Sequence, residues 1–282
     1  IVTGGVSENA VTAAVEAYDP ATNRWTRLGE MGSPRAFHVA VELADGKLLV
    51  VGGSSASADQ FVSTAEVFDP SMGSWTPVSG VSSPRGFHGA VLLADGRVLV
   101  AGGVDGSGTP TDAVEIFDPV TGSWQQAAPL NEATGNQSTV LLNDGRVLVL
   151  GGTRTDGQAT ARAEIFDATT GTWTLTGSMK DARAAQEAVV LSDGRVLVAG
   201  GASDPSSVLA SAEIYDPAVG TWTRTGDMND RRIDHSLTVL LGGRVLAAGG
   251  LRDLFTPQAT TEIFNPSTNT WSSRPDLSGT RF

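Results

Sequence analysis

The chain has no cysteine, only two lysines and few aromatic residues. Without cysteine it can form no disulfide, no thiolate metal site and no cysteine nucleophile. Aromatic residues make up 6% of the 282 residues, and no apolar run approaches the length that crosses a membrane. The net charge of −12 argues against non-specific binding to nucleic acid, because that affinity comes from clustered Lys and Arg.

Glycine is abundant, with 34 residues, and no helix-sized window shows apolar residues at helical spacing. This composition predicts many short strands joined by turns. The scarcity of Lys, the absence of Cys and the many Ser, Thr and Gly residues favour a secreted or cell-surface bacterial protein. Since Ile1 is not an initiator methionine, we expect the sequence to be an excerpt of a longer chain.

An internal repeat organises the whole chain. The six tryptophans are spaced 50, 49, 49, 49 and 49 residues apart, and a glycine pair precedes each of them. The tryptophans are Trp25, Trp75, Trp124, Trp173, Trp222 and Trp271. A period of this length is typical of stacked supersecondary units.

One repeat contains four expected strands. The first runs from about His88 to Leu93, and Asp95-Gly96 is expected to form a two-residue type I′ hairpin turn. Val98 to Ala101 is apolar throughout, which predicts a second strand buried on both faces. Ala113 to Phe117 is the third strand, and Trp124 lies on the fourth, where its ring can fill the wedge between neighbouring units.

The repeat resembles the Kelch motif in its double glycine, its Glu-x-x-Asp-Pro and its spaced Trp. The fourth and sixth copies depart from the acidic motif with Asp167-Ala168 and Asn265-Pro266. The resemblance covers residues 1–282 and implies one all-β domain, a six-bladed Kelch-type β-propeller with four antiparallel strands per blade. It also implies that N- and C-terminal segments together close the first blade.

Aligning Trp271 with Trp25 shows that an innermost strand equivalent to residues 38–48 is absent from the first blade. An open innermost edge leaves backbone donors unpaired. We expect a flanking segment, a strand donated by a partner chain or a rearranged blade to fill that position.

The candidate ligand-binding residues stand where the first strand of each blade begins. One position carries Arg35, Arg85, Thr134, Arg183, Arg232 and Arg281, and three residues later come His38, His88, Gln137, Gln186 and His235. Asn136 joins them because the third repeat breaks the pattern there. The resemblance to peptide-binding Kelch proteins implies that these arginines contact a ligand. The structural alternative is that each Arg binds backbone carbonyls or the repeated Glu.

The first functional hypothesis is a binding module for a polar or acidic peptide, protein or glycan, because guanidinium forks pair with carboxylates. It predicts no cofactor, no metal and no nucleic-acid partner. A second hypothesis is a metal-free epimerase or lyase acting on an acidic sugar, with acid and base drawn from Asp181, Glu187, Asp230 and Asp234. A third is a structural assembly subunit.

Overall fold

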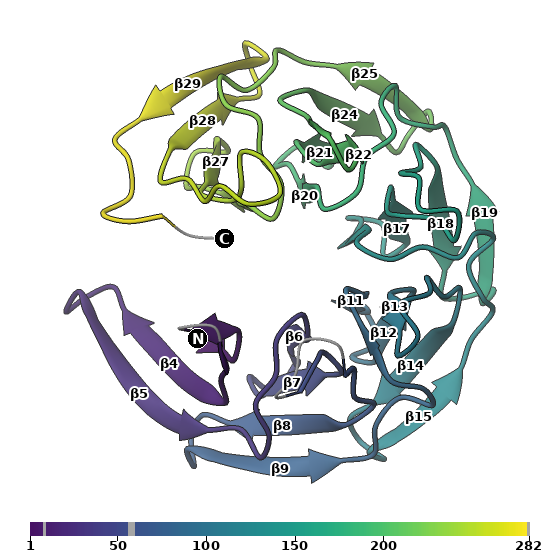
Figure 1. Ribbon diagram of the computed structural model, residues 1–282. Coiled ribbons are helices and arrows are strands. Elements are labelled where there is room, and N and C mark those ends of the chain that lie inside the picture. The colour runs from purple at the N-terminus through teal and green to yellow at the C-terminus, as the bar shows by residue number, and fades with distance from the viewer. Residues whose placement is uncertain (8–9, 56–59, 281–282) are drawn as a thin grey trace. The chain divides into compact units, whose positions relative to one another are not determined.

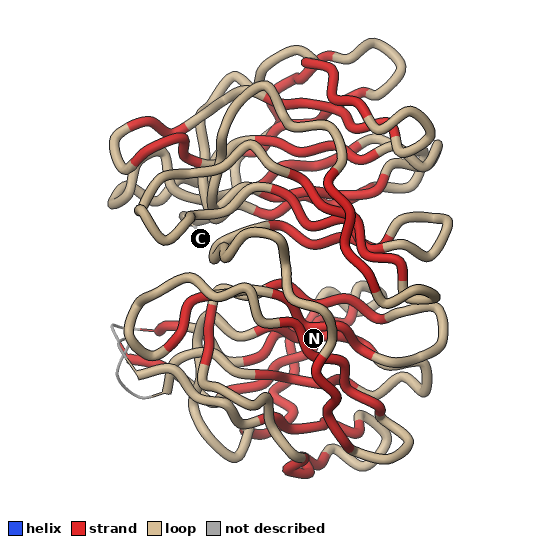
Figure 2. Tube along the Cα trace, turned by 90° about the vertical axis from the view of Figure 1, so that its right-hand side faces the viewer, coloured by secondary structure: helices blue, strands red, loops and turns tan. Residues whose placement is uncertain are grey.

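The computed structural model describes residues 1–7, 10–55 and 60–280, and these segments form strands and loops (Figures 1 and 2). They contain no helix, and so none that could cross a membrane. The chain divides into two compact units, Ile1–Pro129 and Leu130–Phe282.

Unit 1 contains three blade sheets. Their strand orders are β1-β4-β5, β6-β7-β8-β9 and β11-β12-β14-β15. The strands are β1 (Val2–Thr3), β4 (Ala14–Asp19), β5 (Arg24–Glu30), β6 (Val39–Glu42), β7 (Leu48–Val51), β8 (Ala65–Asp69), β9 (Ser74–Val78), β11 (Gly89–Leu92), β12 (Val98–Ala101), β14 (Val114–Asp118) and β15 (Ser123–Gln126). Two short pairs flank them, namely β2 (Val6–Ser7) with β3 (Ala10–Val11) and β10 (Arg85–Gly86) with β13 (Val104–Asp105).

Unit 2 also contains three blade sheets, ordered β16-β17-β18-β19, β20-β21-β24-β25 and β26-β27-β28-β29. The strands are β16 (Ser138–Leu141), β17 (Val147–Leu150), β18 (Ala163–Asp167), β19 (Thr172–Leu175), β20 (Glu187–Val190), β21 (Val196–Ala199), β24 (Ala212–Asp216), β25 (Thr221–Arg224), β26 (Ser236–Val239), β27 (Val245–Ala248), β28 (Thr261–Asn265) and β29 (Thr270–Arg274). One short pair, β22 (Ala202–Asp204) with β23 (Ser207–Val208), lies in a connecting loop.

The predicted blade is confirmed. Every pairing is antiparallel, and each repeat of the sequence forms one sheet, so the chain is an all-β, six-bladed propeller. The first sheet has three strands within the described residues. The segment expected to fill its innermost position stays a prediction.

The hydrophobic core lies between successive blades of a unit. In unit 1, Leu49 and Val51 of β7 belong to the same cluster as Val98, Val100 and Phe117 of the following blade. The second strand is buried on both faces as predicted, since every residue of β12 is fully buried. Burial of each such side chain contributes about 1.5–3 kcal/mol, so blade stacking is a main source of stability.

Trp124 joins neighbouring blades, as predicted, and so does Trp222, whereas Trp25 is 57% exposed. Trp124 donates its indole N–H to the carbonyl of Ser79 in the preceding blade, and Trp222 does the same to Gly177 at 2.8 Å. Each ring also packs on the aromatic side chain opposite it on the third strand, as Trp124 does on Phe117 at 5.0 Å between centroids.

The type I′ turn predicted at Asp95-Gly96 is wrong. Of these two residues only Gly96 has positive φ, at 85°, and Leu93 N–H donates to Arg97 O across a three-residue loop. Such a loop needs a single left-handed residue, which is the glycine. Asp95 instead accepts hydrogen bonds from the N–H and the side chain of Arg97.

The glycine pairs are required by close backbone approach between blades. Gly52 has φ +63°, and a Cβ there would lie 2.6 Å from the carbonyl oxygen of Arg85 in the next blade. The N–H of Gly53 donates to that same oxygen at 2.9 Å. Any side chain at the first glycine would therefore break this contact.

Candidate functional site

The entrance of each first strand and the loop between the second and third strands lie at the same end of the blade. In unit 1 the entrance strand β10 pairs with β13, the segment that directly follows the glycine pair. In unit 2, bridges join Ala184 to Ala202 and Ile233 to Leu251 in the same way. The candidate residues and the variable loops therefore share one end, which we call the entrance end.

The repeated arginines are fully buried at this end. Arg35, Arg85, Arg183 and Arg232 have no exposed surface, and each pairs with the repeated Glu of its own blade. The Arg35 Nη2 lies 2.6 Å from a Glu66 carboxylate oxygen, and its Nη1 donates to the carbonyls of Gly52 and Thr64 at 3.0 and 3.1 Å. The side chain thus ties the strand entrance to the second and third strands.

The entrance is therefore not lined by these four guanidinium groups, because each is withdrawn into its blade. Their geometry matches the structural alternative that the sequence left open. A buried ion pair of this kind is costly to break, since removing one partner leaves an uncompensated charge. Arg281 lies outside the described residues.

Three residues later the side chains lie between blades, where His88, Gln137, Gln186 and His235 are buried and His38 is half-buried. A Cβ on Gly200 would meet the ring of His235, and one on Gly151 would meet the amide of Gln186. Burial, together with the nearby Arg charge, lowers the pKa of His38 to about 4 and those of His88 and His235 to about 3. These rings are neutral at pH 7 and cannot attract an anion by charge.

The position directly before each His or Gln projects from the scaffold instead. It carries Phe37, Phe87, Asn136, Ala185 and Asp234, with φ between 49° and 57°. We call these five the rim residues; each is exposed or half-buried. Within a unit the N–H of one rim residue donates to the carbonyl of the previous one, as Phe87 does to Phe37 at 3.1 Å and Asp234 to Ala185 at 3.1 Å.

The rim of unit 1 is aromatic. Phe37 is 42% exposed and stacks on Phe87 with 4.4 Å between ring centroids. Phe61, from the loop between β7 and β8, meets Phe87 edge-on at 5.9 Å. Gly86 leaves room for Phe61, because a Cβ there would lie 2.4 Å from its ring. A bulky side chain in the left-handed region costs about 1–2 kcal/mol, and here it keeps an aromatic face at the surface.

The rim of unit 2 consists of Asn136, Ala185 and Asp234, and the exposed Glu187 stands next to it at the start of β20. The exposed residues Glu187 and Asp234 both have raised pKa values, which for Glu187 reaches about 7. Surrounding protein atoms, which displace water from the carboxylate, are the main cause, and the charge of Asp234 adds to the shift at Glu187. The two carboxylates are close enough to repel each other.

The other predicted carboxylates are engaged in ion pairs. Asp181 pairs with Arg224 and lies 3.6 Å from Arg183, and Asp230 lies 3.4 Å from Arg252. Within residues 1–7, 10–55 and 60–280 no three acidic or histidine side chains gather closely enough to hold a metal.

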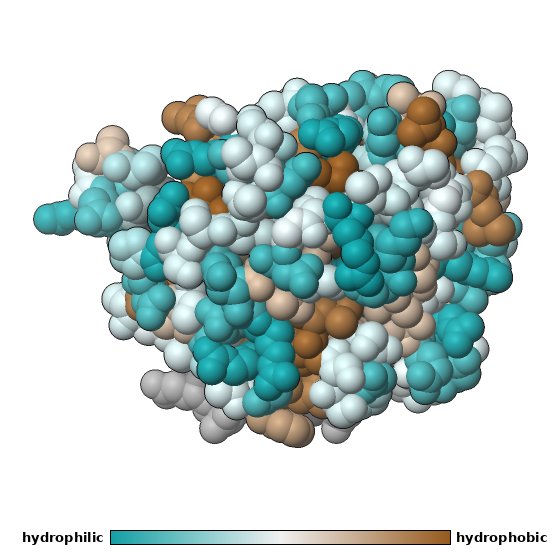
Figure 3. Space-filling view, turned by 90° about the horizontal axis from the view of Figure 1, so that it is seen from above, coloured by the Kyte–Doolittle hydropathy of each residue, from teal (hydrophilic) through white to brown (hydrophobic). Residues whose placement is uncertain are grey.

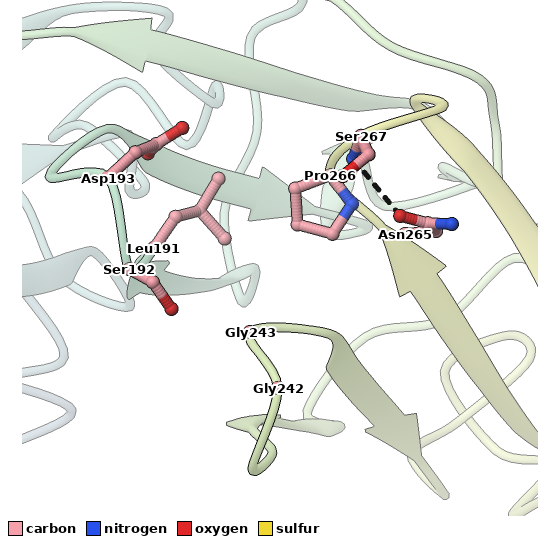
Figure 4. Close-up of a pocket in the computed structure, with 8 residues that line it drawn as sticks. All are labelled: Leu191, Ser192, Asp193, Gly242, Gly243, Asn265, Pro266 and Ser267. Atoms are coloured by element: carbon pink, nitrogen blue, oxygen red, sulfur yellow. Dashed lines mark hydrogen bonds between the residues drawn. The ribbon is translucent and has the colours of Figure 1, made fainter.

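The opposite end, with the turns between strands one and two and between three and four, carries shallow grooves between blades. One groove of about 370 Å³ in unit 2 is lined by residues that include Leu191, Asp193 and Pro266 (Figure 4). A groove of about 460 Å³ occupies the same position at the preceding blade boundary of unit 2, and one of about 340 Å³ in unit 1 lies along β8 and β9, against the third-to-fourth-strand turn of the next blade. Such repetition identifies them as a consequence of blade stacking. On the side of the molecule that Figure 3 shows, hydrophobic residues (brown) form several patches among hydrophilic ones.

Of the candidate set, only Asn136 is a rim residue; Thr134 and Gln137 are buried. The sequence-based candidates lie at this strand entrance, but they did not include the more exposed neighbours Phe37, Phe87, Ala185 and Asp234. The sequence contains a signal for these residues, because this position holds Phe, Asn, Ala or Asp whereas the next one holds only His or Gln. Such variation beside a nearly constant position is typical of an exposed residue on a fixed scaffold.

Strands, pairings and glycine contacts together define a six-bladed β-propeller. Residues 1–201 match the family model described as the KLHDC2/KLHL20/DRC7 Kelch-repeats domain, and residues 188–229 and 235–278 match the Kelch motif. The chain belongs to the Kelch-repeat family.

One curated relative is the mouse influenza virus NS1A-binding protein homolog, 43% identical over 60 residues. That match spans 21% of this chain and 9% of the mouse protein.

Two solved structures share the fold at low identity. A fungal alcohol oxidase of the AA5 family, in complex with copper, superposes with TM-score 0.79 at 19% identity over 99% of this chain and 63% of its own. YjhT superposes with TM-score 0.77 at 17% identity over 97% of this chain and 96% of its own.

Proposed function

We propose that this chain is a protein- or peptide-binding module, and that in each unit the rim residues and the adjoining loops of the entrance end contact ligand. Kelch domains typically bind proteins or peptides, and the rim supplies variable side chains on an invariant backbone. The single observation that carries the proposal is the Phe37–Phe87 stack, which is held at the surface in a costly backbone conformation.

The side chains of the rim indicate which chemical groups the ligand carries. In unit 1 the aromatic faces suit an apolar or aromatic side chain, since stacked and edge-to-face rings gain about 0.5–1.5 kcal/mol beyond burial. In unit 2 the carboxylates of Glu187 and Asp234 suit amide or cationic groups. An acidic ligand is not favoured, because the guanidinium groups that would bind it are already paired.

The enzyme hypothesis gains little from this arrangement. Its mechanism needs Arg, His and carboxylate groups to converge on one substrate. The four described arginines of the candidate set are buried and already paired with glutamates, and the histidines are neutral at pH 7, with pKa values lowered to about 3 to 4.

The test is selection of ligands from a random peptide library and from a glycan array, followed by affinity measurements on variants. We expect peptides with aromatic or apolar residues to be selected. Phe37→Ala should weaken their binding about tenfold, because removing an aromatic contact at the centre of an interface costs at least about 1 kcal/mol.

The matched control is Val120→Ala, which removes an apolar side chain that is 92% exposed at the opposite end. It should leave affinity unchanged. Selection of glycans alone, or equal losses in both variants, would contradict the proposal.

A further inference from the structure

The fourth blade, β16 to β19, keeps a buried carboxylate but lacks the arginine that partners it elsewhere. Thr134 stands at the arginine position, and both Thr134 and Glu164 are 4% exposed. Glu164 accepts two hydrogen bonds, from the backbone and the side-chain amide of Asn131, and both go to Oε2. Among the described residues no cation pairs with this carboxylate.

The sixth blade, β26 to β29, provides an internal comparison. There Asn229 makes the same two bonds to Glu262, at 2.7 Å each, and Arg232 still donates to the other oxygen at 2.9 Å. Asn131 therefore does not replace the missing guanidinium. It occupies a separate position that coexists with an arginine.

The fourth blade also keeps the two backbone carbonyls that accept hydrogen bonds from the arginine in other blades. In the blade of Arg35, β7 and β8 pair Val50 with Glu66, and the corresponding strands β17 and β18 pair Val149 with Glu164. The N–H of Gly151 donates to Arg162 O at 3.0 Å, as that of Gly52 donates to Thr64 O at 3.0 Å. The two carbonyls that Arg35 contacts thus have counterparts at Gly151 and Arg162.

The one nearby arginine side chain lies elsewhere. Arg162 points to Glu132 at 3.6 Å and is 49% exposed, so its guanidinium does not reach the buried position.

We infer that the fourth blade contains a binding site for a guanidinium group, formed by Glu164 with the carbonyls of Gly151 and Arg162. Four other blades show this acceptor set holding a guanidinium, with the carboxylate on one nitrogen and the carbonyls on the other. The planar fork distinguishes this ligand class from a compact ammonium. The inference does not depend on the proposed function of the rim.

The test measures the melting temperature in guanidinium chloride against sodium chloride at equal ionic strength, up to roughly 50 mM, where general denaturation is small. A cation that binds only the folded chain raises its melting temperature with concentration. We expect guanidinium to raise that of the wild type by about 1 °C or more relative to sodium.

Thr134→Arg supplies the missing group from the chain itself. This substitution should raise the melting temperature, and it should abolish the difference between the melting temperatures in guanidinium chloride and in sodium chloride. Glu164→Gln should also abolish the difference, which keeps the test decisive if Thr134→Arg does not fold. The inference is overturned if wild type melts equally in both salts, or if either folded variant keeps the guanidinium effect.

Discussion

At the scale of single residues, the same side-chain type has opposite roles depending on burial. Arg35 is fully buried against Glu66, whereas Arg97 is about one-third exposed against Asp95 at the opposite end. Both form short ion pairs, so distance alone does not separate them. The cost of losing each is set by whether water can replace the partner.

Arg35→Ala should therefore destabilise the chain by about 3–5 kcal/mol, because Glu66 would remain buried without a partner. Arg97→Ala should cost about 1 kcal/mol or less. Urea unfolding of both variants measures the difference. Equal losses of unfolding free energy in the two variants would show that the buried Arg35–Glu66 pair stabilises the fold no more than the exposed Arg97–Asp95 pair.

The buried histidines give stability a pH dependence. His235 has a folded pKa of about 3 and an ordinary value of 6.5, because burial disfavours its charged form. The unfolded chain thus takes up the proton first, and stability falls as pH drops from about 6.5 toward 3.

His235→Gln should remove this contribution, because Gln186 fills the equivalent position in the blade before it and donates to Leu150 O at 2.9 Å. We expect the variant to match the wild type near neutral pH and to exceed its melting temperature at about pH 4. If the difference in melting temperature between the variant and the wild type does not change with pH, His235 is not the source of this pH dependence.

For single residues, the sequence predicts where along the chain the repeated side chains stand, but it does not predict which of them reach solvent. The entrance of the first strand could be found because Arg and His or Gln recur there. Which of three neighbouring side chains reaches solvent depends on φ at the rim residue, and Phe at 55° is not foreseen by any propensity. The segment from Asn131 to Gln137, at the entrance of the fourth blade, looked functional because it departs from the other repeats, and its Thr134 instead lies buried in the scaffold.

At the scale of the structural element, blade-to-blade contact depends on the first glycine of each pair. A Cβ at Gly52 would lie 2.6 Å from a backbone oxygen and 2.8 Å from the ring of His88. Gly46, in a turn with φ +79°, has nothing within 4 Å of the same atom. The two positions share a left-handed backbone and differ only in their surroundings.

Gly46→Ala should consequently cost about 1 kcal/mol, the conformational term alone. Gly52→Ala should cost about 3 kcal/mol or more, because a steric clash with the next blade adds to it. Thermal unfolding of both variants compares them directly. Similar losses would mean that the blades can move apart without penalty.

Strands were the most predictable elements. The second strand, Val98 to Ala101, has the predicted bounds because continuous apolar residues fit only a strand buried on both faces. The Asp-Gly turn was less predictable, since the same dipeptide serves two loop lengths and the choice depends on the Asp95–Arg97 contacts.

At the scale of the whole molecule, the fold separates a repeated scaffold from a varied surface. Arginine, glutamate, glycine and tryptophan recur along the chain; the arginines pair with the glutamates in the interior, and the glycines lie against the arginine carbonyls of the next blade. The rim residues differ from blade to blade and meet solvent. Family membership could be read from the first set, and we propose that the second set determines which ligand binds.

The most direct test of this separation is a paired scan in which melting temperature and affinity for a selected peptide are measured on the same alanine variants. The variants are Arg35, Arg85, Arg183 and Arg232 for the scaffold, and Phe37, Phe87, Asn136 and Asp234 for the rim. The scaffold variants should melt at lower temperature, and rim variants should lose affinity while melting close to the wild type. An arginine variant that loses affinity at an unchanged melting temperature would contradict the account.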